Sequence, residues 1–219
     1  ISTRQIIGVE ALARWVRPET GLLSPEEFIP VLESTGLIKP FTLQILEKSI
    51  SACADCRAKG FDLSVAVNLS AHKLRDQLFP DQVAELLDLY RIDNNILVLE
   101  ISERVIMDDP EMALDILTRL NALNVRISID DFGTGFASLI YLKELPIHQL
   151  KIDHSLVSRV TTDSEDAIIV KSAIGLAQNL GLTVVAEGVE EENVLKVMQN
   201  LGCNSVQGYL VSRPLDADS

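Results

Sequence analysis

The chain of 219 residues carries a formal net charge of −13, which argues against broad binding to DNA or RNA, because such binding needs clustered lysine and arginine. An apolar content of 47% with only 5% aromatic residues fits an α/β protein better than an aromatic-rich sandwich or a disordered segment. No apolar run approaches the ~20 residues that span a bilayer, and three cysteines are too few for a disulfide scaffold. We therefore expect a soluble domain in a reducing, cytoplasmic compartment.

Short apolar segments alternate along the chain with longer stretches of helical period, which indicates repeated βα units around a parallel sheet. The predicted strands are residues 6–13, 63–69, 96–102, 126–130, 149–153, 183–187 and 205–210. Seven strands are one short of a closed eight-stranded barrel. We predict an α/β, TIM-like (β/α)8 barrel whose first strand precedes residue 1, formed by a single, N-terminally truncated domain over residues 1–219.

Helix ends are marked by capping residues. Ser24 followed by Pro25 and Glu27 has the form of a capping box, so a helix is predicted to start there and to end near Gly36. Asp109-Pro110 opens another helix in the same way. The residues predicted to stop helices are Gly60, Gly181 and Gly202.

Cys53 and Cys56 form a CxxC motif, for which a redox or zinc site is one interpretation. They fall inside a predicted helix over residues 40–59, and no second CxxC or His-x-x-His follows. Two ordinary helix cysteines are the favoured interpretation.

Strand side chains alternate between the two faces of a sheet, so parity along each strand shows which residues point the same way. On one face, Val, Leu and Ile recur and are expected to pack on helices. The other face carries small residues and then one strongly polar residue near the carboxyl end of each strand: Glu10, Asn68, Glu100, Asp130, Lys151, Glu187 and Gln207. In a barrel these positions converge at the carboxyl-terminal mouth, where barrel enzymes place their chemistry.

Four carboxylates in that set need cations, because an unpaired buried carboxylate costs several kcal/mol. Carboxylate and amide oxygens without Cys or His suit Mg²⁺ or Mn²⁺. Asp130 could bridge two ions, and Asp131, which has the opposite parity, is predicted just past the regular strand. Two ions are a device for phosphodiester cleavage, in which Lys151 could position the attacking water or offset charge on the phosphate. A structural salt-bridge network is the alternative.

The motifs at these positions are Gly8-Val9-Glu10-Ala11-Leu12-Ala13-Arg14-Trp15, Val67-Asn68-Leu69-Ser70, Leu99-Glu100-Ile101-Ser102-Glu103, Asp130-Asp131-Phe132-Gly133-Thr134-Gly135, Leu150-Lys151-Ile152-Asp153, Val185-Ala186-Glu187-Gly188-Val189-Glu190 and Gln207-Gly208-Tyr209-Leu210. This ordered series, which covers nearly the whole chain, resembles the EAL family of bacterial cyclic di-GMP phosphodiesterases. The resemblance implies metal-dependent hydrolysis of cyclic di-GMP to linear pGpG.

The resemblance also implies a role for each matching residue. Glu10, Asn68, Glu100, Asp130 and Asp131 are the implied metal ligands, Lys151 and Glu187 the catalytic residues acting on the water, and Gln207 the residue supporting the water shell. Leu12 and Arg14 are the implied substrate contacts, with Arg14 on a phosphate. Glu103 is expected to hold the loop over residues 131–138. Mg²⁺ or Mn²⁺, with two ions, is the implied cofactor, and Ca²⁺ the implied inhibitor.

The sequence departs from the family pattern at three places. A Tyr-Gln-Pro-like strand that usually precedes the position of Ile1 is absent, His154 stands where arginine is common, and Phe136-Ala137-Ser138 replaces Tyr-Ser-Ser. A receptor that binds cyclic di-GMP without hydrolysing it is the main alternative function, with another barrel hydrolase or lyase behind it. Family members often act as homodimers and carry an upstream sensor, receiver or GGDEF domain, some in membrane-anchored proteins. The resemblance extends those expectations to this chain.

Overall fold

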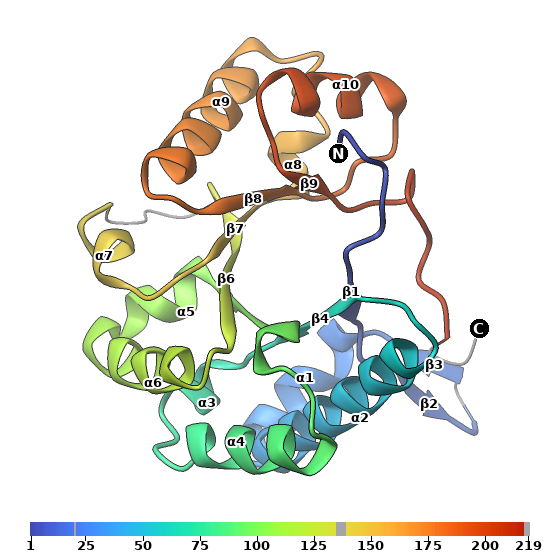
Figure 1. Ribbon diagram of the computed structural model, residues 1–219, viewed down its shortest axis with the longest axis vertical. Helices are drawn as coiled ribbons and strands as arrows, with labels where there is room; N and C mark the ends of the chain where they lie inside the picture. Colours follow the sequence, from blue (N-terminus) through green and yellow to red (C-terminus); the bar gives the residue numbers. More distant parts are fainter. Residues whose placement is uncertain (20, 135–138, 217–219) are drawn as a thin grey trace.

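The computed structural model describes residues 1–19, 21–134 and 139–216. A curled parallel sheet forms its centre (Figure 1), with strand order β1-β4-β5-β6-β7-β8-β9. The strands are β1 (Gly8–Ala11), β4 (Ser64–Asn68), β5 (Leu97–Ser102), β6 (Arg126–Phe132), β7 (Gln149–Ile152), β8 (Thr183–Ala186) and β9 (Ser205–Val206). All seven predicted strands are present and parallel, in a TIM-like arrangement with one strand fewer than a closed eight-stranded barrel.

Helices follow the strands and cover the outer face of the sheet. They are α1 (Pro25–Ser34), α2 (Ile38–Ala58), α3 (Ala71–Leu74), α4 (Phe79–Tyr90), α5 (Glu103–Asp108), α6 (Pro110–Ala122), α7 (Leu139–Glu144), α8 (His154–Val157), α9 (Ser164–Asn179) and α10 (Glu192–Asn200), with a 3-10 turn η1 (Asn94–Ile96) before β5. Within the described residues, no helix is long and apolar enough to cross a membrane.

The core lies between the helices and the outward faces of the strands. The aliphatic residues that the alternation assigned to this face, such as Val65, Leu99, Ile127 and Ile152, are fully or almost fully buried. The same prediction is wrong for β1, where Val9 is 49% exposed. β1 is an edge of the sheet, so its outer face receives less cover than the central strands do.

The predicted helix ends are confirmed. Ser24 N–H donates to the Glu27 carboxylate at 2.8 Å in a capping box, with Pro25 in the first helical position. Asp109 accepts a hydrogen bond from Met112 N–H at the start of α6. Gly60 has a φ of +92°, a left-handed conformation that glycine adopts without strain and that ends α2.

The CxxC motif lies inside α2, as the favoured interpretation predicts. Cys53 is buried and its thiol donates to the carbonyl of Leu63 at 3.2 Å, while Cys56 is partly exposed and both are free thiols. The motif is therefore part of the packing of α2 against the strand that follows.

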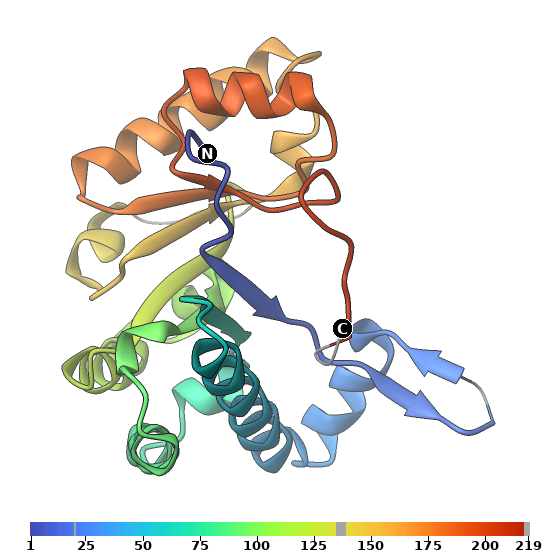
Figure 2. The same cartoon turned by 45° about the vertical axis from the view of Figure 1, so that its right-hand side comes forward.

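An antiparallel hairpin that the sequence did not predict joins β1 to α1. Its strands are β2 (Trp15–Arg17) and β3 (Gly21–Leu23), and Figure 2 shows the hairpin standing away from the barrel. The predicted first and last strands are also too long, since β1 and β9 keep only 4 and 2 residues.

Candidate metal centre at the strand ends

Lys151 lies at the centre of the polar residues that the strand parity brought together. Its ammonium nitrogen is 2.7 Å from Glu187, 2.9 Å from Glu100, 3.4 Å from Asp130 and 3.6 Å from Glu10, and its side chain is only 1% exposed. Four strands, β1, β5, β6 and β7, and the residue after β8 thus deliver their polar groups to one point. The convergence at the carboxyl ends of the strands is confirmed.

Glu10 accepts hydrogen bonds from two further residues of the strand-end set. Asn68 at the end of β4 donates its amide N–H to Glu10 Oε1 at 2.7 Å, and Gln207 after β9 donates to Glu10 Oε2 at 2.6 Å. Because β1 and β9 are the two edges of the sheet, the Gln207 contact joins the edges across the opening of the barrel. All seven predicted strand-end residues therefore belong to one hydrogen-bonded and ion-paired network.

The pair Asp130 and Asp131 depends on an irregularity in β6. The register with β7 shifts between Ile129 and Phe132, and Asp131 has a left-handed φ of +56°. This bulge turns Asp131 to the same side as its neighbour, and one carboxylate oxygen each from Asp130, Asp131 and Glu187 lie within 4.8 Å of one another. Asp131 was predicted just past the regular strand, and the regular pairing does stop before it; the predicted end of the strand at residue 130 is wrong, because β6 continues to Phe132.

Like charges at short range dominate the electrostatics. Burial, with the nearby Glu10 and Asp130 carboxylates, raises the pKa of Glu100 to about 8, although Lys151 opposes the shift. Burial and Asp130 likewise raise the pKa of Glu187 to about 7. Burial alone would lower the pKa of Lys151, but the surrounding carboxylates outweigh it and hold that pKa above its ordinary value. Lys151 therefore stays charged, and one ammonium is left to offset several carboxylates.

The donor set matches a hard divalent cation. Its members offer carboxylate and amide oxygens, and among the described residues Glu100 Oε2 is buried without a hydrogen-bond partner. Burial and the charge of Asp130 also raise the pKa of Asp131. Four carboxylates crowded around one ammonium leave an excess of negative charge that a divalent cation would offset, so the residues fit a divalent metal ion.

Glu103 lies beside the start of the loop that follows β6. It is buried, and its Oε2 accepts a hydrogen bond from Gly133 N–H at 3.4 Å. The Phe136-Ala137-Ser138 departure lies outside the described residues. His154, the other departure, begins α8, where its Nδ1 is 3.4 Å from Asp153 Oδ2.

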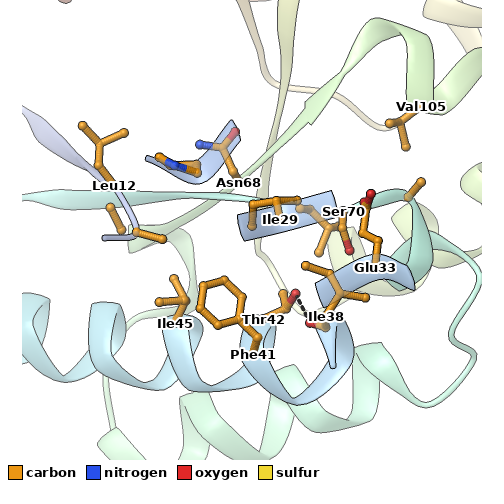
Figure 3. A pocket seen from close by; sticks show the side chains of 15 residues that line it. Leu12, Ile29, Glu33, Ile38, Phe41, Thr42, Ile45, Asn68, Ser70 and Val105 are labelled. Atoms are coloured by element: carbon orange, nitrogen blue, oxygen red, sulfur yellow. Dashed lines mark hydrogen bonds between the residues drawn. The ribbon is translucent and has the colours of Figure 1, made fainter. Parts of the chain in front are cut away.

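Leu12 and Arg14 follow β1 on the way to the hairpin. Arg14 is exposed and bonds only the neighbouring carbonyl of Ala13 among the described residues, at 2.9 Å. Leu12 borders a largely apolar cavity of about 320 Å³ between the ends of β1 and β4 and helices α1 and α2 (Figure 3). Phe41 and Ile45 of α2 form one wall, and Asn68 of the carboxylate network lies at its edge.

The cavity also contains residues that the sequence did not single out. Glu33 of α1 reaches it, with a carboxylate oxygen 3.8 Å from His72 Nδ1, and so does Ser70, whose buried hydroxyl has no partner among the described residues. No local pattern marks Glu33, which lies in an ordinary amphipathic helix. Its position becomes relevant only when α1 packs over the ends of β1 and β4.

Fold and site together define a parallel (β/α) barrel domain with an acidic, cation-type centre at the carboxyl ends of its strands. The family model described as "EAL domain" matches residues 1–214. The chain belongs to the EAL domain family.

Two curated relatives come from Pseudomonas aeruginosa. The chain is 42% identical over 217 residues to the "Bifunctional diguanylate cyclase/cyclic di-GMP phosphodiesterase MucR", covering 97% of this chain and 31% of that protein. It is 36% identical to the "Cyclic di-GMP phosphodiesterase PA2567", covering 98% of this chain and 37% of that protein. The chain thus spans about a third of the length of these relatives.

Solved structures resemble the fold closely. The "PaMucR Phosphodiesterase, c-di-GMP complex" aligns with a TM-score of 0.94 at 42% identity over 98% of this chain and 87% of that one. The "EAL Enzyme Bd1971" in its cAMP- and cyclic-di-GMP-bound form aligns with a TM-score of 0.90 at 33% identity, over 96% of this chain and 58% of that one.

Proposed function

We propose that this domain hydrolyses one phosphodiester bond of cyclic di-GMP and releases linear pGpG, with Mg²⁺ or Mn²⁺ as cofactor. The observation that carries the proposal is the single network of seven strand-end groups, in which four carboxylates surround one lysine. The names of the relatives and the cyclic di-GMP complex of the similar MucR domain support the choice of substrate.

We propose that the site binds two divalent metal ions. Glu10, Asn68, Glu100, Asp130 and Asp131 are the proposed ligands, and Gln207 supports the water around them. When bound, Mg²⁺ or Mn²⁺ supplies Lewis-acid chemistry that polarises the phosphate and offsets charge on the leaving oxygen. Ca²⁺ is the proposed inhibitor, because its larger and looser coordination alters the spacing that hydrolysis needs.

Glu187 and Lys151 act on the reacting groups in this proposal. In hydrolysis, water adds to phosphorus, one P–O ester bond breaks, and the released oxygen takes up a proton. Glu187, whose carboxylate has an oxygen within 4.8 Å of those of Asp130 and Asp131, is suited to accept the proton of the attacking water. Lys151, held charged by its neighbours, keeps Glu187 in place and places a positive charge where negative charge develops on the phosphate.

The apolar cavity beside the network is the proposed place for one guanine base. Phe41 offers a flat aromatic ring and Leu12 an aliphatic contact, and the Glu33 carboxylate can accept hydrogen bonds from the N–H edge of guanine. Arg14, exposed at the end of β1, is the proposed contact for a phosphate. Glu103 is proposed to hold the loop after β6 through Gly133.

The test is to incubate the domain with cyclic di-GMP and Mg²⁺ or Mn²⁺ and to separate the nucleotides by chromatography. We expect pGpG to form with metal and not with EDTA. Asp130→Asn should abolish pGpG formation, and Asp76→Asn is its matched control, because it removes the charge of a carboxylate that pairs with Lys73 outside the network and should leave hydrolysis intact. Unchanged nucleotide under conditions where binding is measured would instead establish the alternative, a receptor without hydrolysis.

The remaining expectations extend beyond the domain. A homodimer, an upstream sensor, receiver or GGDEF domain, and a cytoplasmic location stay predictions, as does a single domain over residues 1–219 that lacks an N-terminal strand. The length of the relatives supports action of the domain within larger proteins, because this chain matches only about a third of each.

A further inference from the structure

Ser128 lies on the inner face of β6, two residues before Asp130, with 0% of its surface exposed. Its hydroxyl has no hydrogen-bond partner among the described residues. A buried hydroxyl without a partner is unfavourable, and alanine would satisfy the packing at this position without that penalty. A serine here therefore calls for a partner within reach.

Glu100 presents the complementary group on the neighbouring strand. Its Oε1 is 2.9 Å from Lys151, whereas its Oε2 is buried and without a partner in the part of the chain that the structure describes. Glu100 and Ser128 are direct Cα partners in the parallel pairing of β5 with β6, so their side chains leave adjacent strands about 4.8 Å apart. A carboxylate oxygen only accepts hydrogen bonds, and a hydroxyl can donate one.

We propose that Ser128 is a positioning residue for the metal centre, whose hydroxyl anchors Oε2 of Glu100 directly or through one buried water. Anchoring one oxygen fixes the plane of the carboxylate, so that Oε1 stays directed toward Lys151 and the proposed cation. In this proposal the contact forms through another staggered χ1 rotamer of Ser128 or through one water held by both atoms. The inference rests on the proposed function, because it assigns Glu100 to the metal.

Gln149 is the Cα partner of Ser128 on its other side, in β7. It is partly exposed, so its amide can form hydrogen bonds with solvent, whereas Glu100 is 2% exposed and has no such access. Of the two neighbours, Glu100 has the greater need of a donor.

The test measures Mn²⁺ affinity by titration calorimetry, without substrate, for the wild-type domain and for Ser128→Ala. We expect the dissociation constant to rise about tenfold in Ser128→Ala, as for other residues that orient a metal ligand. Ser128→Cys nearly keeps the size of the side chain and keeps a weak hydrogen-bond donor, so its dissociation constant should lie between those of wild type and Ser128→Ala. Ser64→Ala is the control. Ser64 lies on β4, four residues before Asn68, and its hydroxyl donates to the carbonyl of Ile7 outside the metal centre.

Thermal unfolding in EDTA checks that Ser128→Ala and Ser64→Ala both remain folded at the temperature of the titration, because each loses one hydrogen bond and its melting temperature falls modestly. A loss of Mn²⁺ affinity confined to Ser128→Ala then reports on positioning of the metal ligand. In a Glu100→Gln background, Ser128→Ala should have no further effect on Mn²⁺ affinity. An unchanged affinity in Ser128→Ala, an equal loss in Ser64→Ala, or a full tenfold loss in the Glu100→Gln background would overturn this inference alone. Absence of Mn²⁺ binding by the wild-type domain would overturn it together with the proposed metal dependence.

Discussion

Replacing Lys151 by methionine tests whether the strand-end network is a site for cations or a structural salt-bridge cluster. The substitution keeps most of the volume of the side chain but removes the only ammonium that contacts Glu10, Glu100, Asp130 and Glu187 within the described residues. Removing one partner of a buried ion pair costs about 3–5 kcal/mol, because the other charge is left uncompensated. With four carboxylates affected, we expect the upper part of that range in metal-free protein.

For a domain of this size, about 5 kcal/mol corresponds to a fall of roughly 10–20 °C in the melting temperature. Saturating Mg²⁺ should recover much of that loss, because cations then offset the same carboxylates. The assay is calorimetric unfolding of wild type and Lys151→Met in EDTA and in excess Mg²⁺, with nucleotide hydrolysis measured in parallel. Turnover of the variant should be lost even where its stability is restored.

Lys73 provides a matched control, since it is the other lysine with a fully buried side chain among the described residues. It is 3.2 Å from Asp76 and 3.1 Å from Gln82, away from the strand-end network. Lys73→Met should therefore be destabilised to the same degree with and without Mg²⁺. Equal destabilisation of Lys151→Met in EDTA and in Mg²⁺ would refute the reasoning and favour a structural salt-bridge cluster.

Three further predictions concern the same centre. Asp130→Asn should weaken Mn²⁺ binding at least tenfold and abolish turnover while circular dichroism stays unchanged; full activity at several metal concentrations would contradict its role. Glu187→Gln should lower kcat by about 10²–10⁴-fold with little change in the dissociation constant of cyclic di-GMP, and equal losses in both would argue for a binding role. The raised pKa values of Glu100, about 8, and Glu187, about 7, favour the protonated carboxyl groups in the folded state. Their contribution to stability is therefore fully present below pH 4.5, the ordinary pKa of glutamate, and is lost as the pH rises through 7 to 8. The melting temperature in EDTA should therefore fall over that range while Mn²⁺ affinity rises, because metal and protons compete; an affinity independent of pH would count against the assignment.

Much of the fold was predictable from local pattern. Short apolar segments between longer stretches of helical period identified every strand of the parallel sheet, and the capping residues at Ser24 and Asp109 identified two helix starts, because both signals depend on neighbouring residues. The hairpin of β2 and β3 was missed, since Trp15–Arg17 and Gly21–Leu23 are too short to show an alternation.

The strand-end residues could also be named in advance, because in a parallel barrel parity and strand direction bring such positions to one mouth. The contacts among these residues could not be predicted from the sequence. That Lys151 meets four carboxylates, and that Gln207 reaches Glu10 across the two edges of the sheet, follows from the curvature of the sheet, which no strand encodes by itself.

Asp130 and Asp131 show most clearly what the sequence determined and what the tertiary structure decided. The sequence by itself determined that two adjacent carboxylates end a buried strand, and their opposite parity led to the prediction that Asp131 lies just past the regular strand. Only the tertiary structure decided how the two carboxylates come together, because a shift in register against β7 and a left-handed φ at Asp131 turn the second carboxylate toward the first. Such a bulge depends on pairing with a strand about twenty residues away, so it is a property of the assembled sheet.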